Sequence, residues 1–259
     1  MRGFKTPFVG HLTAGLALLV AQASLASASE IKVFSTIGVQ AALEELAPKI
    51  EAATGNKPAI TWGTAAILVR KIQAGETADL YVLTGQGLAD LIKESKVAPG
   101  SEADIASSGM GVVVKHGAPR PDISTPETYK QTLLNAKAIA YSDPASGGAS
   151  GVFFAKTLER MGIADQMKAK TKHPPPSGNS AKLVVSGEAE LAVQQEPEVI
   201  SVEGVDIIGA PPGDLNNITS YAAGISPNAK DPDAAKAVIK LLKTPEAAAV
   251  YKARVLKPA

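Results

Sequence analysis

The feature that most constrains the fold is a regular alternation of two hydrophobic patterns from Glu30 onward. Short apolar runs of strand length are followed repeatedly by stretches in which apolar residues recur at helical spacing. This alternation favours an α/β fold, in which parallel strands are joined by right-handed crossovers. The predicted strands are residues 31–35, 58–62, 78–83, 109–115, 138–141, 191–195, 205–209 and 219–225, and the predicted helices are residues 39–50, 67–72, 85–94, 126–135, 152–161, 179–186, 231–243 and 245–254.

A loop of small residues, 142–151, joins a predicted strand to a predicted helix. The first backbone N–H groups of a helix lack partners within it, and the peptide dipoles place about half a positive charge there. Such an end attracts anions, and small residues let a ligand approach the backbone closely. Ser146 and Ser150 add hydroxyl donors. The structural alternative is that Ser150 is an N-cap and that Gly147 belongs to a tight connection.

Two earlier loops repeat this order of strand, small polar loop and helix. They are residues 35–38 and 63–66. In open α/β sheets the ligand crevice lies beyond the carboxyl ends of the strands, where these loops fall. Helix capping is the alternative role for their hydroxyls. The candidate ligand-binding residues of the three loops are Ser35, Thr36, Gly38, Thr64, Ala65, Ser146, Gly147, Ser150 and Gly151.

The composition argues against several other classes of function. The formal net charge is +1 and Lys and Arg form no long run, whereas nucleic-acid binding needs clustered basic residues. Aromatic residues make up only 4% of the chain, which disfavours base stacking. There is no cysteine, and His11, His116 and His173 lack metal-ligand spacing. We therefore expect no metal, no cofactor and no nucleic-acid partner.

The N-terminus has the pattern of an export signal. Arg2 and Lys5 form a charged region, residues 12–20 form a short apolar core, and residues 26–28 form a small-residue cleavage site. We predict a signal peptide over residues 1–28 that is cleaved after Ala28; an N-terminal anchor helix is the alternative. An exported chain without cysteine cannot carry a thioether-linked lipid. The mature protein is therefore expected to be a freely diffusing periplasmic monomer.

Connectors rich in Gly and Pro predict two lobes. One is the Pro-rich stretch at residues 116–124, and a second is the loop at 211–213. We predict a first lobe from residues 29–113, a second lobe from 114–221, and a return to the first lobe over 222–259.

Three segments together resemble a known family. They are residues 31–36, residues 68–81 with the pattern Arg-x-Ile-x-Ala-Gly-x-x-Ala-Asp, and residues 142–144. They resemble the periplasmic solute-binding proteins of the molybdate-binding type, over essentially all of the mature chain. The resemblance implies the two-lobed type 2 periplasmic-binding-protein fold with two inter-lobe crossovers. It also implies that the lobes close on a small anion, which is delivered to an ABC-type membrane permease.

The resemblance also bears on the ligand. In the molybdate-binding pattern, two serines near the first two strand ends and a tyrosine of the second lobe contact the oxyanion. These positions align with Gly38, Ala65 and Gln195, which have no hydroxyl. Losing several converging donors weakens the binding of a desolvated oxyanion. An organic carboxylate is therefore favoured, and molybdate or tungstate is an alternative because neighbouring residues supply displaced hydroxyls.

Residues 140–147, 187–191 and 194–195 are similar to one branch of this family, the periplasmic aconitate isomerases. This similarity implies a small di- or tricarboxylate as ligand. Gln195 suits such a ligand, because its amide both donates and accepts hydrogen bonds, and it completes the candidate ligand-binding set. The alternative is that Gln194 and Gln195 are a strand-edge pair with one side chain in solvent.

Two classes of function follow from these patterns. A binding protein, our first interpretation, needs only donors in a cleft and a hinge. An isomerase, the alternative, also needs a base to move a proton between two carbons. The candidate bases are Tyr141, Asp143, His173 and Glu196, which spacing alone does not distinguish. Arg70 is a candidate carboxylate clamp, with a structural ion pair as its alternative role.

Overall fold

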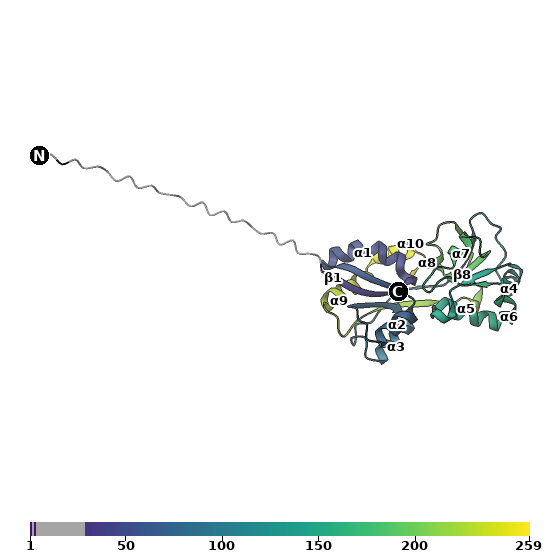
Figure 1. Cartoon of the computed structure of the whole chain (residues 1–259), viewed down its shortest axis with the longest axis horizontal. Coiled ribbons are helices and arrows are strands. Elements are labelled where there is room, and N and C mark those ends of the chain that lie inside the picture. Colours follow the sequence, from purple (N-terminus) through teal and green to yellow (C-terminus); the bar gives the residue numbers. More distant parts are fainter. Residues whose placement is uncertain (2, 4–28) are drawn as a thin grey trace.

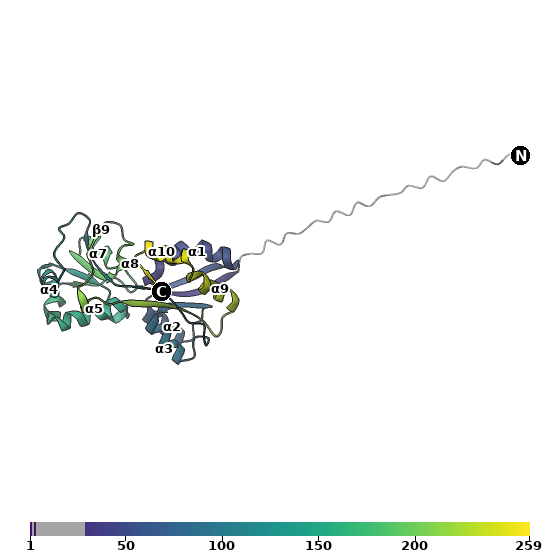
Figure 2. The ribbon, with the colours of Figure 1, turned by 180° about the vertical axis from the view of Figure 1, so that it is seen from behind.

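The computed structural model describes residues 1, 3 and 29–259, so the predicted signal peptide lies, apart from residues 1 and 3, outside the described residues. Two α/β lobes lie side by side (Figures 1 and 2). The first lobe is built on a six-stranded sheet in the order β11-β4-β10-β3-β1-β2, and the second on a five-stranded sheet in the order β7-β6-β8-β5-β9. The predicted two-lobed α/β fold is confirmed.

The bounds of the elements are as follows. The strands are β1 (Glu30–Thr36), β2 (Lys57–Gly63), β3 (Leu80–Thr84), β4 (Ala103–Ser108), β5 (Met110–Lys115), β6 (Ile139–Tyr141), β7 (Thr171–Lys172), β8 (Leu191–Gln195), β9 (Val205–Gly209), β10 (Thr219–Ile225) and β11 (Lys257–Pro258). The α-helices are α1 (Gln40–Thr54), α2 (Ala65–Gln73), α3 (Gly85–Lys93), α4 (Pro126–Asn135), α5 (Ala149–Arg160), α6 (Ala164–Lys168), α7 (Ala181–Val185), α8 (Glu196–Val199), α9 (Pro232–Leu242) and α10 (Pro245–Ala253). Three short 3₁₀ helices are η1 (Ile37–Val39), η2 (Pro144–Ser146) and η3 (Gly213–Leu215).

Strand β3 shows why the first sheet is covered on both faces. Successive side chains of a strand point to opposite faces of its sheet. Leu80 and Val82 belong to the core formed with α1, α9 and α10, whereas Tyr81 and Leu83 belong to the core formed with α2 and α3. Because both faces are apolar, the sheet needs a helical layer on each side. This arrangement brings the starts of α2 and α3 to the carboxyl ends of β2 and β3.

The second sheet is covered in the same way. Val112 and Val193 pack in the core that includes residues of α4, α5 and α6, while Val113 and Ala192 pack in the core that includes residues of α7 and α8. Helix α5 follows β6, so its start lies at the carboxyl end of that strand. Both lobes therefore place helix starts at the strand ends where ligands bind in α/β sheets.

The sheets are mixed, whereas the strand and helix alternation predicts parallel pairs alone. Strand β1 pairs in parallel with β2 and β3, and β6 pairs in parallel with β7 and β8. Strand β5 is antiparallel to β8 and β9, and β10 is antiparallel to β3 and β4. Strands β5 and β10 are the first strands after the chain changes sheet, so no crossover helix within the same sheet sets their direction. The short strand β11 is also antiparallel to its neighbour β4.

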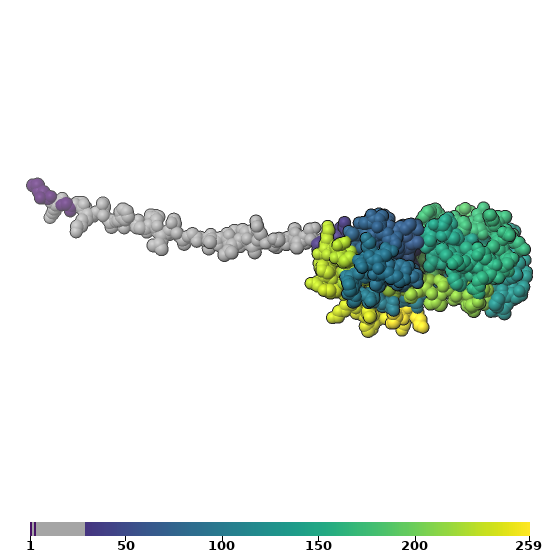
Figure 3. Space-filling view, turned by 90° about the horizontal axis from the view of Figure 1, so that it is seen from below, coloured from purple at the N-terminus to yellow at the C-terminus, as the bar shows by residue number. Residues whose placement is uncertain are grey.

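The chain passes between the lobes twice. It changes sheet between Ser108 and Met110, and again between Gly209 and Thr219. The lobe boundaries predicted at 113/114 and 221/222 stay predictions. In Figure 3 the early and the last residues form one lobe, and the middle of the chain forms the other. None of the helices within residues 29–259 is long and apolar enough to cross a membrane.

Candidate ligand-binding site

A cavity lies between the two lobes. Its volume is about 30 Å³, room for about two water molecules, so the lobes close tightly around it in this structure. The first lobe lines it with Thr36, Ile37, Thr64, Ala65, Thr84, Thr219 and Tyr221. The second lobe lines it with Ser142, Asp143, Ser146, Gly148, Ala149, Ser150, Pro174, Pro175, Ser177, Gly178, Gln195 and Glu198.

The start of α5 is the main contribution of the second lobe. The helix begins at Ala149, three residues before the predicted start at 152, and its N-cap is Gly148, which has no side chain to bond the first N–H groups. Ser150 therefore lies in the first turn and is not the N-cap. It is only 3% exposed, it lines the cavity, and no described residue hydrogen-bonds its hydroxyl. Unpaired N–H groups and a free hydroxyl thus meet at one place.

Gly151 allows α5 to begin so close to β6. A Cβ at this position would lie 2.9 Å from the carbonyl carbon of Ser142 and still closer to its oxygen. That carbonyl is backbone and has little freedom to move. Gly151 does not itself line the cavity; it supports the helix start that does.

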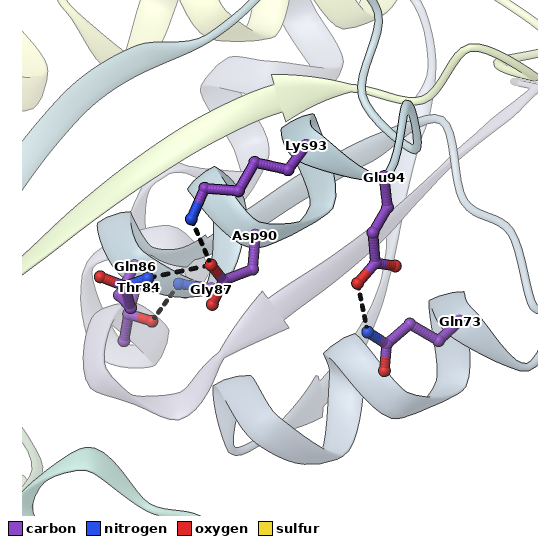
Figure 4. Close-up of polar contacts among 7 residues, drawn as sticks. All are labelled: Gln73, Thr84, Gln86, Gly87, Asp90, Lys93 and Glu94. Atoms are coloured by element: carbon purple, nitrogen blue, oxygen red, sulfur yellow. Dashed lines mark hydrogen bonds and ion pairs between the residues drawn. The ribbon is translucent and has the colours of Figure 1, made fainter.

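The helix starts of the first lobe are capped by their own side chains. Thr64 is the N-cap of α2, and its hydroxyl accepts a hydrogen bond from the N–H of Ile67 at 3.3 Å. Thr84 is the N-cap of α3, and its hydroxyl accepts from the N–H of Gly87 at 3.2 Å (Figure 4). Thr64 therefore caps a helix, which is the alternative role given above for the hydroxyls of this loop. By contrast, Thr36 at the start of η1 makes no side-chain cap hydrogen bond.

Loop 142–151 touches the first lobe directly. The hydroxyl of Thr64 donates to the carbonyl of Ser146 at 2.9 Å, which is a hydrogen bond between the lobes. The hydroxyl of Ser146 donates within its own loop, to the carbonyl of Asp143 at 2.7 Å. Gly147 has a φ of +71°, and a Cβ there would collide with Ala66. Ser146 lines the cavity, whereas Gly147 serves the turn and the inter-lobe contact.

Gln195 lines the cavity and joins the lobes through hydrogen bonds. Its Oε1 accepts from the Ser108 hydroxyl at 2.7 Å, and its Nε2 donates to the Thr219 hydroxyl at 2.7 Å. Ser108 in turn lies 3.0 Å from the hydroxyl of Tyr221. Ser108, Thr219 and Tyr221 belong to the first lobe, and Gln195 to the second. Neither Gln194 nor Gln195 is exposed to solvent, so the strand-edge alternative is wrong.

The two positions that align with oxyanion-holding serines, Gly38 and Ala65, lie in different surroundings. A Cβ on Gly38 would collide with the ring of Tyr221, which lies 2.7 Å away at its Cε1. Gly38 does not line the cavity; Ala65 does, and it presents only a methyl group. Ser35 is fully buried, and its hydroxyl donates to the carbonyl of Thr36 at 3.3 Å. Ser35 and Gly38 thus shape the first strand end without reaching the cavity.

The charge around the cavity is unusual for an anion site. Of the lining residues named above, none is Lys, Arg or His, and two are acidic, Asp143 and Glu198. Asp143 accepts a hydrogen bond from the N–H of Ala145 at 2.9 Å, which is a local cap of η2. Burial raises the pKa of Glu198 to about 7, although a hydrogen bond from Gln194 opposes that shift. Arg70 is exposed, makes no ion pair among the described residues and does not line the cavity.

The candidate bases differ in whether they line the cavity. Asp143 lines the cavity, but Tyr141, His173 and Glu196 do not. The rings of Tyr141 and His173 meet edge to face at 4.7 Å, and the two residues line a separate surface groove. Glu198, which sequence analysis missed, is the second carboxyl at the cavity.

Other lining residues were also missed. Thr84 has the same signal as the recognised loops, a hydroxyl between a predicted strand and a predicted helix. Glu198 follows the end of a predicted strand by three residues, which is a weaker signal of the same kind. Thr219 and Tyr221 lie on the strand that returns from the second lobe, so only the tertiary fold brings them to the site.

The fold and the cavity define a two-lobed solute-binding protein. Residues 31–254 match the family described as bacterial extracellular solute-binding protein, and the chain belongs to this family. The chain is 34% identical to an aconitate isomerase from Pseudomonas sp., over 93% of this chain and 94% of that protein. It is 24% identical to the molybdate-binding protein ModA of Escherichia coli, over 92% and 93%. Among solved structures, the periplasmic molybdate-binding protein of Azotobacter vinelandii aligns with a TM-score of 0.71 and 20% identity, over 88% of this chain and 98% of that one.

Proposed function

We propose that this chain is a periplasmic binding protein that captures a small organic anion with two or more carboxylates and delivers it to an ABC-type permease. The observation that carries the proposal is the uncapped start of α5, where the Ser150 hydroxyl and unpaired N–H groups line the inter-lobe cavity. Such neutral donors stabilise an anion through the helix dipole and direct hydrogen bonds, without a cationic side chain.

The donor set favours a carboxylate over a tetrahedral oxyanion. At the two strand ends of the first lobe, Gly38 cannot carry a side chain beside Tyr221, and Ala65 offers a methyl group. The higher identity to the aconitate isomerase than to ModA agrees with this choice. A di- or tricarboxylate is larger than the closed cavity, so we expect the lobes to part on binding and to close around the ligand.

A thermal-shift screen tests this proposal. A ligand present at about 100 times its dissociation constant stabilises the folded state by about 2.7 kcal/mol, which for a chain of this size raises the Tm by about 5–10 °C. We expect cis- and trans-aconitate or citrate to give this shift, and molybdate, tungstate, sulfate and phosphate to give little. A shift with molybdate at micromolar concentration, without one for any carboxylate, would contradict the proposal.

A second candidate function is isomerisation of a bound unsaturated carboxylate. The relative named aconitate isomerase matches nearly the whole chain, and the cavity holds two carboxyls, Asp143 and Glu198, as possible proton carriers. Incubation with cis-aconitate in deuterated water, followed by proton NMR, separates the two functions. A binding protein leaves cis-aconitate unchanged, whereas an isomerase forms the trans isomer. If the proton that the enzyme removes exchanges with solvent, the product also contains deuterium.

A further inference from the structure

Among the residues that the structure describes, Glu198 is the one carboxyl that lines both the cavity and the groove beside it. In the cavity it lies with Ser150, Gln195 and Tyr221 among the lining residues. In the groove, which has a volume of about 500 Å³, it lies with residues of α1, α7 and the segment after α8. Glu198 therefore faces the groove as well as the cavity, and the groove gives it a second path to solvent.

The groups that form hydrogen bonds with Glu198 carry no positive charge that would neutralise its carboxylate. Gln194 donates its Nε2–H to the carboxylate, and Gln194 is itself fixed by the N–H and hydroxyl of Ser180 at 2.7 and 2.6 Å. Asn179 donates to the backbone carbonyl of Glu198 at 2.6 Å. Toward the first lobe stands Tyr221, whose pKa is raised by burial and by the charge of Glu198.

No described residue that lines the cavity carries a positive charge that could act as a counter-ion. Asp143 is the other acid of the cavity wall. In the groove are Glu44 from α1, Lys182 from α7 and Glu203 beyond α8, and all three are exposed. The single cation among them is thus a solvated lysine on the groove side. An anion in the cavity would therefore meet Glu198 with no positive side chain between them.

We propose that Glu198 takes up a proton when a carboxylate fills the cavity and then donates a hydrogen bond to that ligand. This inference rests on the proposed function. Two ionised carboxylates in one desolvated site repel each other strongly, and one of them is protonated instead. Ionised Glu198 would repel the carboxylate of the ligand. Protonated Glu198 instead donates a hydrogen bond to it, in addition to those from the N–H groups of α5.

The proposal fixes the direction of a pH dependence. In the empty protein, burial sets the pKa of Glu198 at about 7, and a bound anion raises it further. Below about pH 7 Glu198 already carries its proton, so its contribution to affinity is constant. Above that pH, binding requires proton uptake, and Kd rises by up to about tenfold per pH unit until the pKa of the complex is reached.

Calorimetry with trans-aconitate as the probe tests this coupling. Titrations at about pH 8, one unit above the pKa of Glu198, are made in phosphate and in Tris, whose ionisation enthalpies differ, so that the difference in measured heat gives the protons taken up. The wild type should take up close to one proton per ligand. The variant Glu198→Gln should take up almost none, and its Kd should change little across the pH range in which that of the wild type rises.

The matched control is Glu196→Gln, two residues earlier on the same short helix. Burial raises the pKa of Glu196 too, but this residue does not line the cavity. This variant should behave like the wild type. Binding without proton uptake by the wild type, or equal uptake by Glu198→Gln, would overturn the role of Glu198 while leaving the proposed function intact. If trans-aconitate, cis-aconitate and citrate all fail to bind, the proposed function and this inference fall together.

Discussion

The α-helices α2 and α3 of the first lobe begin differently from α5 of the second lobe, at the place where the lobes meet at the cavity. In the first lobe, Thr64 and Thr84 cap α2 and α3, and their hydroxyls satisfy N–H groups of the first turn. In the second lobe, Gly148 leaves α5 without a side-chain cap, and the hydroxyl of Ser150 has no partner among the described residues. The caps bond one N–H group at each start, that of Ile67 in α2 and that of Gly87 in α3, whereas no side chain caps the first turn of α5. We therefore expect the second lobe to hold the charge of the proposed ligand and the first lobe to close over it.

The largest effect is expected from Gly151→Ala. The added Cβ meets the backbone carbonyl of Ser142, so either α5 or β6 must shift. Overpacking of this kind costs about 1–3 kcal/mol of folding stability, and the displaced helix start should lose most of its ligand affinity. Chemical denaturation and calorimetry with trans-aconitate measure the two effects. Gly148→Ala is the stability control, because a Cβ there would lie at an ordinary 3.4 Å from the Cβ of Ser142.

Ser150→Ala isolates the free hydroxyl of α5. The change leaves the backbone N–H groups in place and removes one donor. A hydrogen bond to a charged group contributes about 1.5–3 kcal/mol, so Kd for trans-aconitate should rise by about 10- to 150-fold. The Tm of the unliganded protein should change little, because no described residue uses this hydroxyl. An unchanged Kd would show that Ser150 does not contact the ligand.

Thr64→Ala tests the capped helix starts. The hydroxyl of Thr64 both caps α2 and bonds the carbonyl of Ser146 across the lobes. Its loss should lower folding stability by about 1 kcal/mol, which is typical of a lost cap. Ligand affinity should fall by less than in Ser150→Ala, because the Thr64 hydroxyl already donates one hydrogen bond and accepts another within the protein. A greater loss of affinity than in Ser150→Ala would reverse the assignment of roles to the two lobes.

The smallest effect is expected from Ser146→Ala. Its hydroxyl donates to the carbonyl of Asp143 within the same loop. Net loss of such a hydrogen bond costs about 1 kcal/mol of stability or less. Kd should stay within about twofold of the wild type, the range expected for a substitution that leaves the ligand contacts intact. The Kd values of this variant and of Ser150→Ala, measured by calorimetry, thus distinguish two serines of one loop for which the sequence predicts the same role.

Much of the fold could be predicted because its signals are local. The alternation of residues such as Leu80, Tyr81, Val82 and Leu83 reports a strand buried on both faces. Strand β4 was missed because Ser107, Ser108 and Asp104 interrupt any apolar run. Its pairing with β10 and β11, rather than its own hydrophobicity, holds it in the sheet.

The site was predicted in part, for a similar physical reason. Thr36, Thr64, Ala65, Ser146, Ser150 and Gln195 line the cavity, while Ser35, Gly38, Gly147 and Gly151 shape the backbone around it. A loop sequence reveals which residues lie at a strand end, but not which hydroxyls are already paired. That distinction depends on contacts between lobes, such as the bond from Thr64 to Ser146. Their roles in ligand binding stay predictions.

The most direct test of the account follows the backbone N–H groups themselves. In amide NMR of the labelled protein titrated with trans-aconitate, the proton resonances of Ala149 and Ser150 should move downfield and saturate, because a carboxylate accepts hydrogen bonds from the open start of α5. Those of Ile67 and Gly87, already bonded to Thr64 and Thr84, should move far less. Large saturating shifts at Ile67 and Gly87, with Ala149 and Ser150 unmoved, would contradict the account.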